Sequence, residues 1–122
     1  MDILLVEDNP GDVRLAQEAF RNSNAAVTLH IARDGEEAMS FLRREGVHVD
    51  APRPHIILLD LNLPRLDGRE TLAKIKSDKS FKAIPTIILT TSDAEVDISY
   101  CYENYANCYV RKPTHAGSVE HV

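Results

Sequence analysis

Long apolar runs are missing from this chain of 122 residues. No stretch approaches the roughly 18 apolar residues that a transmembrane helix needs. The first residues, MDILLVEDN, form a short apolar run ended by acid, without the basic start and small-residue cleavage site of a signal peptide. We therefore expect a soluble, cytoplasmic protein without a membrane segment.

Cysteine and clustered basic residues are also scarce. The two cysteines, Cys101 and Cys108, have neither a CxxC nor a Cys/His ligand spacing, so we interpret them as small core residues. Acidic residues outnumber basic ones by 19 to 14, for a net charge of −5, and no basic run is longer than a pair. This balance argues against binding of nucleic acid through electrostatics. The five histidines show no metal-ligand spacing either.

The chain contains no linker-like stretch, which fits a single domain over residues 1–122. Apolar runs typical of strands alternate with amphipathic segments typical of helices. The expected strands are residues 3–6, 27–32, 56–59, 86–89 and 108–110. Because two of these runs are continuously apolar or nearly so, as in parallel strands covered on both faces, we predict an α/β fold. The predicted architecture is a flavodoxin-like, doubly wound sheet of five parallel strands in the order 2-1-3-4-5.

Capping signals indicate where the helices begin. Asn9 before Pro10 suits an N-cap with proline in the first helical position. An acidic or hydroxyl residue is followed three positions later by glutamate in the pairs Asp34 with Glu37, Asp67 with Glu70, and Ser92 with Glu95.

The fourth predicted helix carries several aromatic residues. Its spacing predicts that Tyr102 and Tyr105 lie on the core face, and that Tyr100 and Val96 are exposed.

Reactive side chains follow the carboxyl ends of the predicted strands, where doubly wound sheets build their sites. Glu7 and Asp8 follow the first strand, and Asp60 follows the third. In the order 2-1-3 these strand ends are neighbours. Each acid alone could be a helix cap or a loop residue, but a cluster of three carboxylates would repel itself and favours a hard divalent cation, with Mg²⁺ as the first candidate.

Asp60 ends the most apolar run in the chain, which would fix its carboxylate as a nucleophile able to form an acyl phosphate. Lys112 would supply a compact cation from the fifth strand, and Thr90 a hydroxyl from the fourth. A lysine before proline is also common on surfaces, and threonine is an ordinary strand residue. The alignment of all three with strand ends is what favours a functional interpretation.

Four segments, VEDN, LLDLNLPRLDG, PTIILTTSD and YVRKP, occur here in an order and spacing that resemble the receiver domain of two-component response regulators. The resemblance covers residues 2 to about 114. It implies a signalling switch in which Asp60 accepts a phosphoryl group from a phosphohistidine of a sensor histidine kinase. It also implies that Mg²⁺ is bound by Asp8, Asp60 and the backbone carbonyl of Asn62, with Glu7 acting through water. Thr90 and Lys112 would contact the phosphoryl group. The Lys112-Pro113 peptide would be cis, and Tyr109 would be the switch aromatic.

The resemblance extends to partners. The long loop and the run IPTIILTTSDAEVDI resemble single-domain regulators that accompany bacterial phytochrome kinases. Such a protein would be an acceptor rather than a turnover enzyme, with autophosphatase activity at most, and we expect a homodimer through the fourth helix and fifth strand.

Two features depart from the family pattern. Where the family places glycine near the end of the fourth helix, this chain has Tyr105-Ala106-Asn107, and we expect Asn107 to adopt the left-handed conformation. Only nine residues follow Pro113, so the fifth helix is expected to be cut short after a stripe that begins Ala116, Val119 and Val122.

Three other functions share parts of this pattern. A haloacid-dehalogenase-type phosphatase needs a second Asp where this chain has Asn62. A flavodoxin needs a phosphate-binding first loop, whereas EDNPGD presents carboxylates. A receiver-like interaction module that works without phosphorylation remains the alternative function, although no acceptor-site residue is missing.

Overall fold

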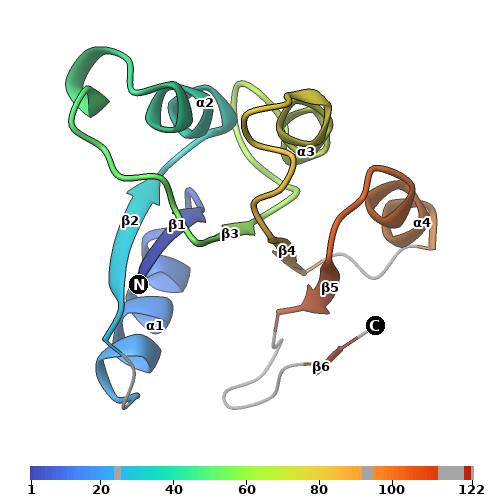
Figure 1. The fold of residues 1–122 in the computed structure, drawn as a ribbon. Helices are drawn as coiled ribbons and strands as arrows, with labels where there is room; N and C mark the ends of the chain where they lie inside the picture. The colour runs from blue at the N-terminus through green and yellow to red at the C-terminus, as the bar shows by residue number, and fades with distance from the viewer. Residues whose placement is uncertain (24–25, 92–94, 113–119, 122) are drawn as a thin grey trace.

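The computed structural model describes residues 1–23, 26–91, 95–112 and 120–121. One sheet runs through the molecule (Figure 1). Its strands are β1 (Asp2–Val6), β2 (Thr28–Ala32), β3 (Ile56–Leu59), β4 (Thr86–Thr90), β5 (Cys108–Arg111) and β6 (Glu120–His121). The helices are α1 (Pro10–Arg21), α2 (Gly35–Arg43), α3 (Gly68–Ser77) and α4 (Glu95–Glu103), with a short 3₁₀ helix η1 (Gly46–His48). Within the described ranges no helix is long and apolar enough to cross a membrane.

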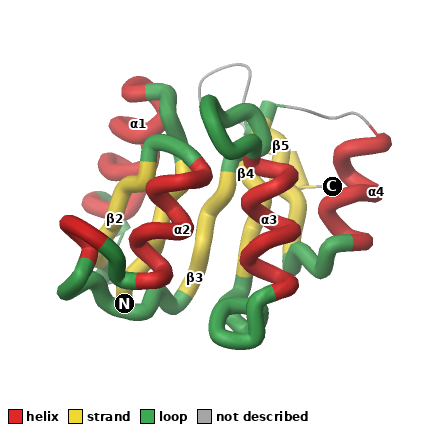
Figure 2. Tube along the Cα trace, turned by 90° about the horizontal axis from the view of Figure 1, so that it is seen from above, coloured by secondary structure: helices red, strands yellow, loops and turns green. Residues whose placement is uncertain are grey.

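The strand order β2-β1-β3-β4-β5 is parallel throughout, which confirms the predicted flavodoxin-like topology. Helix α1 lies on one face of the sheet, and α2, α3 and α4 lie on the other (Figures 1 and 2). Because β1 and β3 are central and covered by helices, their apolar side chains form the middle of the core; Leu4, Ile57 and Leu59 are fully buried.

The end of the chain differs from the prediction at two residues. Glu120 and His121 form a two-residue strand, β6, antiparallel to β5 and paired with Arg111 and Val110. The remainder of the expected fifth helix and the expected cis peptide before Pro113 lie outside the described residues.

The tyrosines of α4 correct the predicted helix faces. Tyr105 is 76% exposed and Tyr102 is 42% exposed, whereas Tyr100 packs against the core and donates its hydroxyl to the carbonyl of Arg69 at 3.2 Å. Val96 is exposed, as predicted. The periodicity of α4 was misleading because apolar residues occur around the whole helix.

The left-handed residue after α4 is Tyr105, with φ of 66°, and not Asn107. The N–H groups of Tyr105 and Ala106 donate to the carbonyls of Tyr102 and Cys101 in a Schellman arrangement. Asn107 instead aligns β4 with β5. Its N–H donates to the Thr86 carbonyl, and its side-chain oxygen accepts from the Thr86 N–H, each at 2.9 Å.

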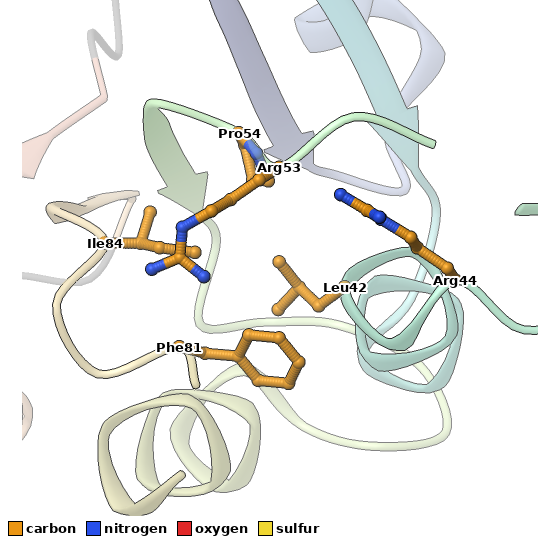
Figure 3. Close-up of a pocket in the computed structure, with 6 residues that line it drawn as sticks. All are labelled: Leu42, Arg44, Arg53, Pro54, Phe81 and Ile84. Atoms are coloured by element: carbon orange, nitrogen blue, oxygen red, sulfur yellow. The ribbon is translucent and has the colours of Figure 1, made fainter. Parts of the chain in front are cut away.

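A small pocket lies at the opposite end of the sheet from the strand-end acids (Figure 3). Two arginines extend across an apolar floor, in a set formed by Leu42, Arg44, Arg53, Pro54, Phe81 and Ile84. Arg53 and Pro54 precede β3 and Ile84 precedes β4, so the pocket borders the amino ends of the strands. None of the predicted site residues contributes to it.

Candidate functional site

The carboxyl ends of β1, β3 and β5 place their polar residues through continued sheet hydrogen bonds. The Glu7 N–H donates to Ala32, the Asp60 N–H to Val6, and the Lys112 N–H to Thr90, at 2.9, 3.1 and 2.6 Å. Each residue therefore extends the ladder by one position beyond its strand. This fixes the backbone from which the three candidate side chains project.

Three carboxylates converge at this edge, as the sequence predicted. Glu7, Asp8 and Asp60 each present an oxygen within 4.8 Å of the others. Glu7 and Asp60 are buried, whereas Asp8 is exposed. The Asn62 N–H donates to Asp60 Oδ1 at 3.1 Å, which holds the acceptor candidate toward the cluster. Such a set of hard oxygen donors fits a small divalent cation.

Lys112 reaches into the same cluster, as predicted. Its ammonium donates to Glu7 Oε1, to Asp60 Oδ2 at 3.0 Å and to Asp12 Oδ2 at 2.9 Å. The sequence reasoning missed Asp12. Its position in the first turn after the cap at Asn9 was the available signal, because a helix that follows β1 starts beside the strand ends.

Asn9 fixes this helix start. Its side-chain oxygen accepts from the N–H groups of Gly11 and Asp12 at 2.8 and 3.1 Å, as the N-cap prediction required. Its own N–H donates to Glu7 Oε2 at 3.2 Å. The turn between β1 and α1 thus connects Glu7 directly to the helix that carries Asp12.

Negative charge dominates the site, because it contains four carboxylates and one ammonium, which contacts three of them. Burial raises the pKa of Glu7 to about 7, Lys112 opposes the rise, and the charge of Asp60 adds to it. Burial lowers the pKa of Lys112, but its hydrogen bonds with Glu7 and Asp12 and the charge of Asp60 outweigh burial and raise that pKa above its ordinary value. A cation placed among the carboxylates would relieve this excess charge.

Gly68 allows the loop after Asp60 to close tightly. A Cβ at Gly68 would lie 2.1 Å from the Asp60 carbonyl oxygen and 2.5 Å from the Leu61 Cα, distances that no side chain can adopt. The Gly68 N–H donates to the Leu61 carbonyl at 3.0 Å. Any larger residue would displace the backbone of the acceptor candidate.

The predicted side-chain cap by Asp67 is wrong, because Asp67 makes no such hydrogen bond. Its carboxylate accepts from Arg69 Nη1 at 3.3 Å instead. Arg69 also forms a bidentate pair with Asp97 on α4, at 2.8 and 2.7 Å. No motif in the sequence indicated this link between the loop after β3 and α4. The other unconfirmed cap, Ser92, lies outside the described residues.

Thr90 and Tyr109 are both fully buried. Thr90 ends β4 and pairs in register with Arg111, and Tyr109 pairs with Ile88. The Tyr109 N–H donates to the Tyr102 hydroxyl at 3.2 Å, which joins β5 to α4. Thr90 therefore occupies the strand end expected for a phosphoryl contact, and the Tyr109 ring already faces inward.

Comparison with known proteins identifies the family. The response regulator receiver domain matches residues 3–121. Response regulator Rcp1 of Synechocystis is 51% identical over 110 residues, which cover 90% of this chain and 75% of Rcp1. The probable methanogenesis regulatory protein FilR2 of Methanothrix harundinacea is 41% identical over 112 residues, covering 91% of this chain and 71% of FilR2.

Solved structures agree in fold. The Mn²⁺-bound form of Rcp1 has a TM-score of 0.91 at 49% identity, with 94% of this chain and 83% of that chain covered. The phosphorylated cyanobacterial phytochrome response regulator RcpA has a TM-score of 0.90 at 52% identity, with 93% and 81% covered.

Proposed function

This chain belongs to the response regulator receiver domain family and is a phosphoacceptor of two-component signalling, and from that premise we propose that Asp60 is the residue that receives the phosphoryl group. The observation that carries the proposal is the position of Asp60. Its carboxylate is buried, belongs to the acidic cluster, and lies 3.0 Å from the Lys112 ammonium. No other described carboxylate is buried, belongs to the acidic cluster, contacts Lys112 and also lies at the end of β3.

In the proposed reaction an Asp60 oxygen attacks the phosphorus of a phosphohistidine on a sensor kinase. A P–O bond forms as the P–N bond breaks, and the electron pair of that bond returns to the histidine nitrogen. The product is an acyl phosphate. Lys112 would then donate to a phosphoryl oxygen, and Thr90 would offer its hydroxyl to another.

Mg²⁺ is the proposed cofactor. Glu7, Asp8, Asp60 and the backbone carbonyl of Asn62 would hold it, and the cation would neutralise charge on the transferred oxygens. Burial is the main cause of the raised pKa of Glu7 and the charge of Asp60 adds to it, so a cation beside Glu7 would offset the cost of its ionised form. Rcp1 has been solved with Mn²⁺, another hard divalent cation.

The proposed output is a change in the α4–β5 surface. Thr90 would move toward the phosphoryl group, and Tyr109 would report that movement from β5, so phosphorylation would favour one of two arrangements of this surface. Val96, Tyr102 and Tyr105 are exposed there, which suits a second copy of the chain or a partner protein. We propose a phytochrome-type histidine kinase as the cytoplasmic phosphodonor, since RcpA is a phytochrome response regulator. We also propose that slow autophosphatase activity removes the phosphoryl group.

Intact-mass measurement tests the acceptor assignment. Treatment with acetyl phosphate and MgCl₂ should add one phosphoryl group to the wild type, and a chelator should prevent the addition. Asp60→Asn should show no gain, whereas Asp50→Asn, which changes an exposed loop carboxylate, should behave like the wild type. Retention of the gain in Asp60→Asn would overturn the proposal.

A further inference from the structure

Among the described residues that contact the Lys112 ammonium, Asp12 alone lies outside the acidic cluster. It projects from the first turn of α1, and its Oδ2 lies 2.9 Å from the Lys112 ammonium. The Asp12 side chain is 36% exposed, whereas the other two carboxylates that contact Lys112 are almost completely buried. Asp12 therefore contacts the Lys112 ammonium on its more solvent-exposed side.

The contacts of Lys112 account for its full donor capacity. A lysine ammonium has three N–H donors, and here they face Glu7, Asp12 and Asp60. A phosphoryl group on Asp60 can gain a hydrogen bond from Lys112 only if one of these carboxylates gives up its share. Glu7 and Asp60 belong to the set that would hold a cation. Asp12 lies outside that set, so its contact with Lys112 does not compete with a cation.

We propose that Asp12 is a positioning residue that holds the Lys112 ammonium on the α1 side of the site and competes with the phosphoryl group for it. This inference rests on the proposed function of Asp60. The competition is electrostatic: the Asp12 carboxylate attracts the ammonium, and it repels the phosphoryl oxygens. Asp12 therefore limits how strongly the protein retains phosphate, and it keeps Lys112 ordered when no phosphate is present.

The direction of the effect follows from this charge arrangement. Asp12→Asn keeps the size of the side chain and removes its charge, so Lys112 should turn more completely toward a phosphoryl group. Beryllofluoride, a stable phosphoryl mimic, should bind Asp12→Asn about three- to tenfold more tightly than the wild type in saturating Mg²⁺, as expected for a unit charge about 4 Å away that is screened as in water, because Asp12 is partly exposed. Asp12→Glu, which retains the charge, should remain close to the wild type.

The contact between the two residues can be tested without metal or phosphate. In chelator, Asp12→Asn should lower the thermal midpoint of the otherwise unchanged protein. The same substitution in a Lys112→Ala background should lower it much less, because the partner of Asp12 is gone. The beryllofluoride effect should also be smaller in that background, because only the repulsion between Asp12 and the phosphoryl mimic remains.

Controls separate a positioning role from a general charge effect. Glu18→Gln removes one exposed charge from the same helix, away from Lys112, and should leave beryllofluoride affinity unchanged. If Asp12→Asn lowered stability but left beryllofluoride affinity at the wild-type value, the ion pair would be merely structural and the inference would be wrong. If wild-type protein failed to bind beryllofluoride or to accept phosphate at all, the proposed function itself would fail.

Discussion

The pKa of Glu7 provides a test of how burial and neighbouring charges affect the stability of the site. Burial raises its pKa, Lys112 opposes the rise and Asp60 adds to it, which gives a value of about 7 against an ordinary 4.5. A carboxyl with a raised pKa binds its proton more tightly in the folded protein than in the unfolded chain. The contribution of Glu7 to the stability of the metal-free protein is therefore most favourable below pH 4.5, becomes less favourable as the pH rises, and is least favourable above about pH 7.

The magnitude follows from that difference in pKa. Each pKa unit corresponds to about 1.4 kcal/mol, so ionised Glu7 should cost the folded protein about 3 kcal/mol at alkaline pH. Glu7→Gln preserves the shape of the side chain but cannot ionise. It should therefore be more stable than the wild type by up to about 3 kcal/mol above pH 7, and nearly equal to it near pH 4.5, although it loses an ion pair with Lys112.

Urea unfolding followed by far-UV circular dichroism in chelator, at several pH values across this range, measures the difference. Glu18→Gln on the exposed surface of α1 serves as the control and should track the wild type at every pH. If the wild type instead gained stability relative to Glu7→Gln as the pH rose above 4.5, attraction to Lys112 would exceed the cost of burial. Glu7 would then need no cation to offset the cost of its charge.

Three further substitutions have defined outcomes. Arg69→Gln breaks the bidentate pair with Asp97 and should lower the free energy of unfolding by about 1–3 kcal/mol in urea titrations. A loss smaller than about 0.5 kcal/mol would mean that solvent fully screens the pair. Gly68→Ala places a methyl group against the Asp60 carbonyl, so it should slow acetyl phosphate labelling and lower the thermal midpoint together, and unchanged labelling would contradict the close approach. Tyr105→Gly relieves a left-handed backbone at an exposed position and should stabilise the protein by about 0.5–1 kcal/mol, and destabilisation would show that the ring makes a necessary contact.

Local sequence signals were sufficient for much of the fold. Continuous apolar runs before Asp60 and around β4 predicted parallel strands, because only a strand covered on both faces is apolar at successive positions. Asn9 before Pro10 predicted the start of α1, because a cap depends on hydrogen bonds within a few residues. The same reasoning failed on α4, where apolar residues surround the helix and only packing selects Tyr100 over Tyr105.

The candidate site divides in the same way. The amino-acid sequence determined that Glu7, Asp8, Asp60 and Lys112 meet, because parallel strands deliver their carboxyl ends to one edge of the sheet. Only the tertiary structure decided that Asp12 completes the Lys112 environment and that Arg69 ties the loop after β3 to Asp97. Those contacts depend on the distance and angle at which a helix packs beside a strand or another helix. Side chains far apart in the chain set that geometry together, and no short segment encodes it.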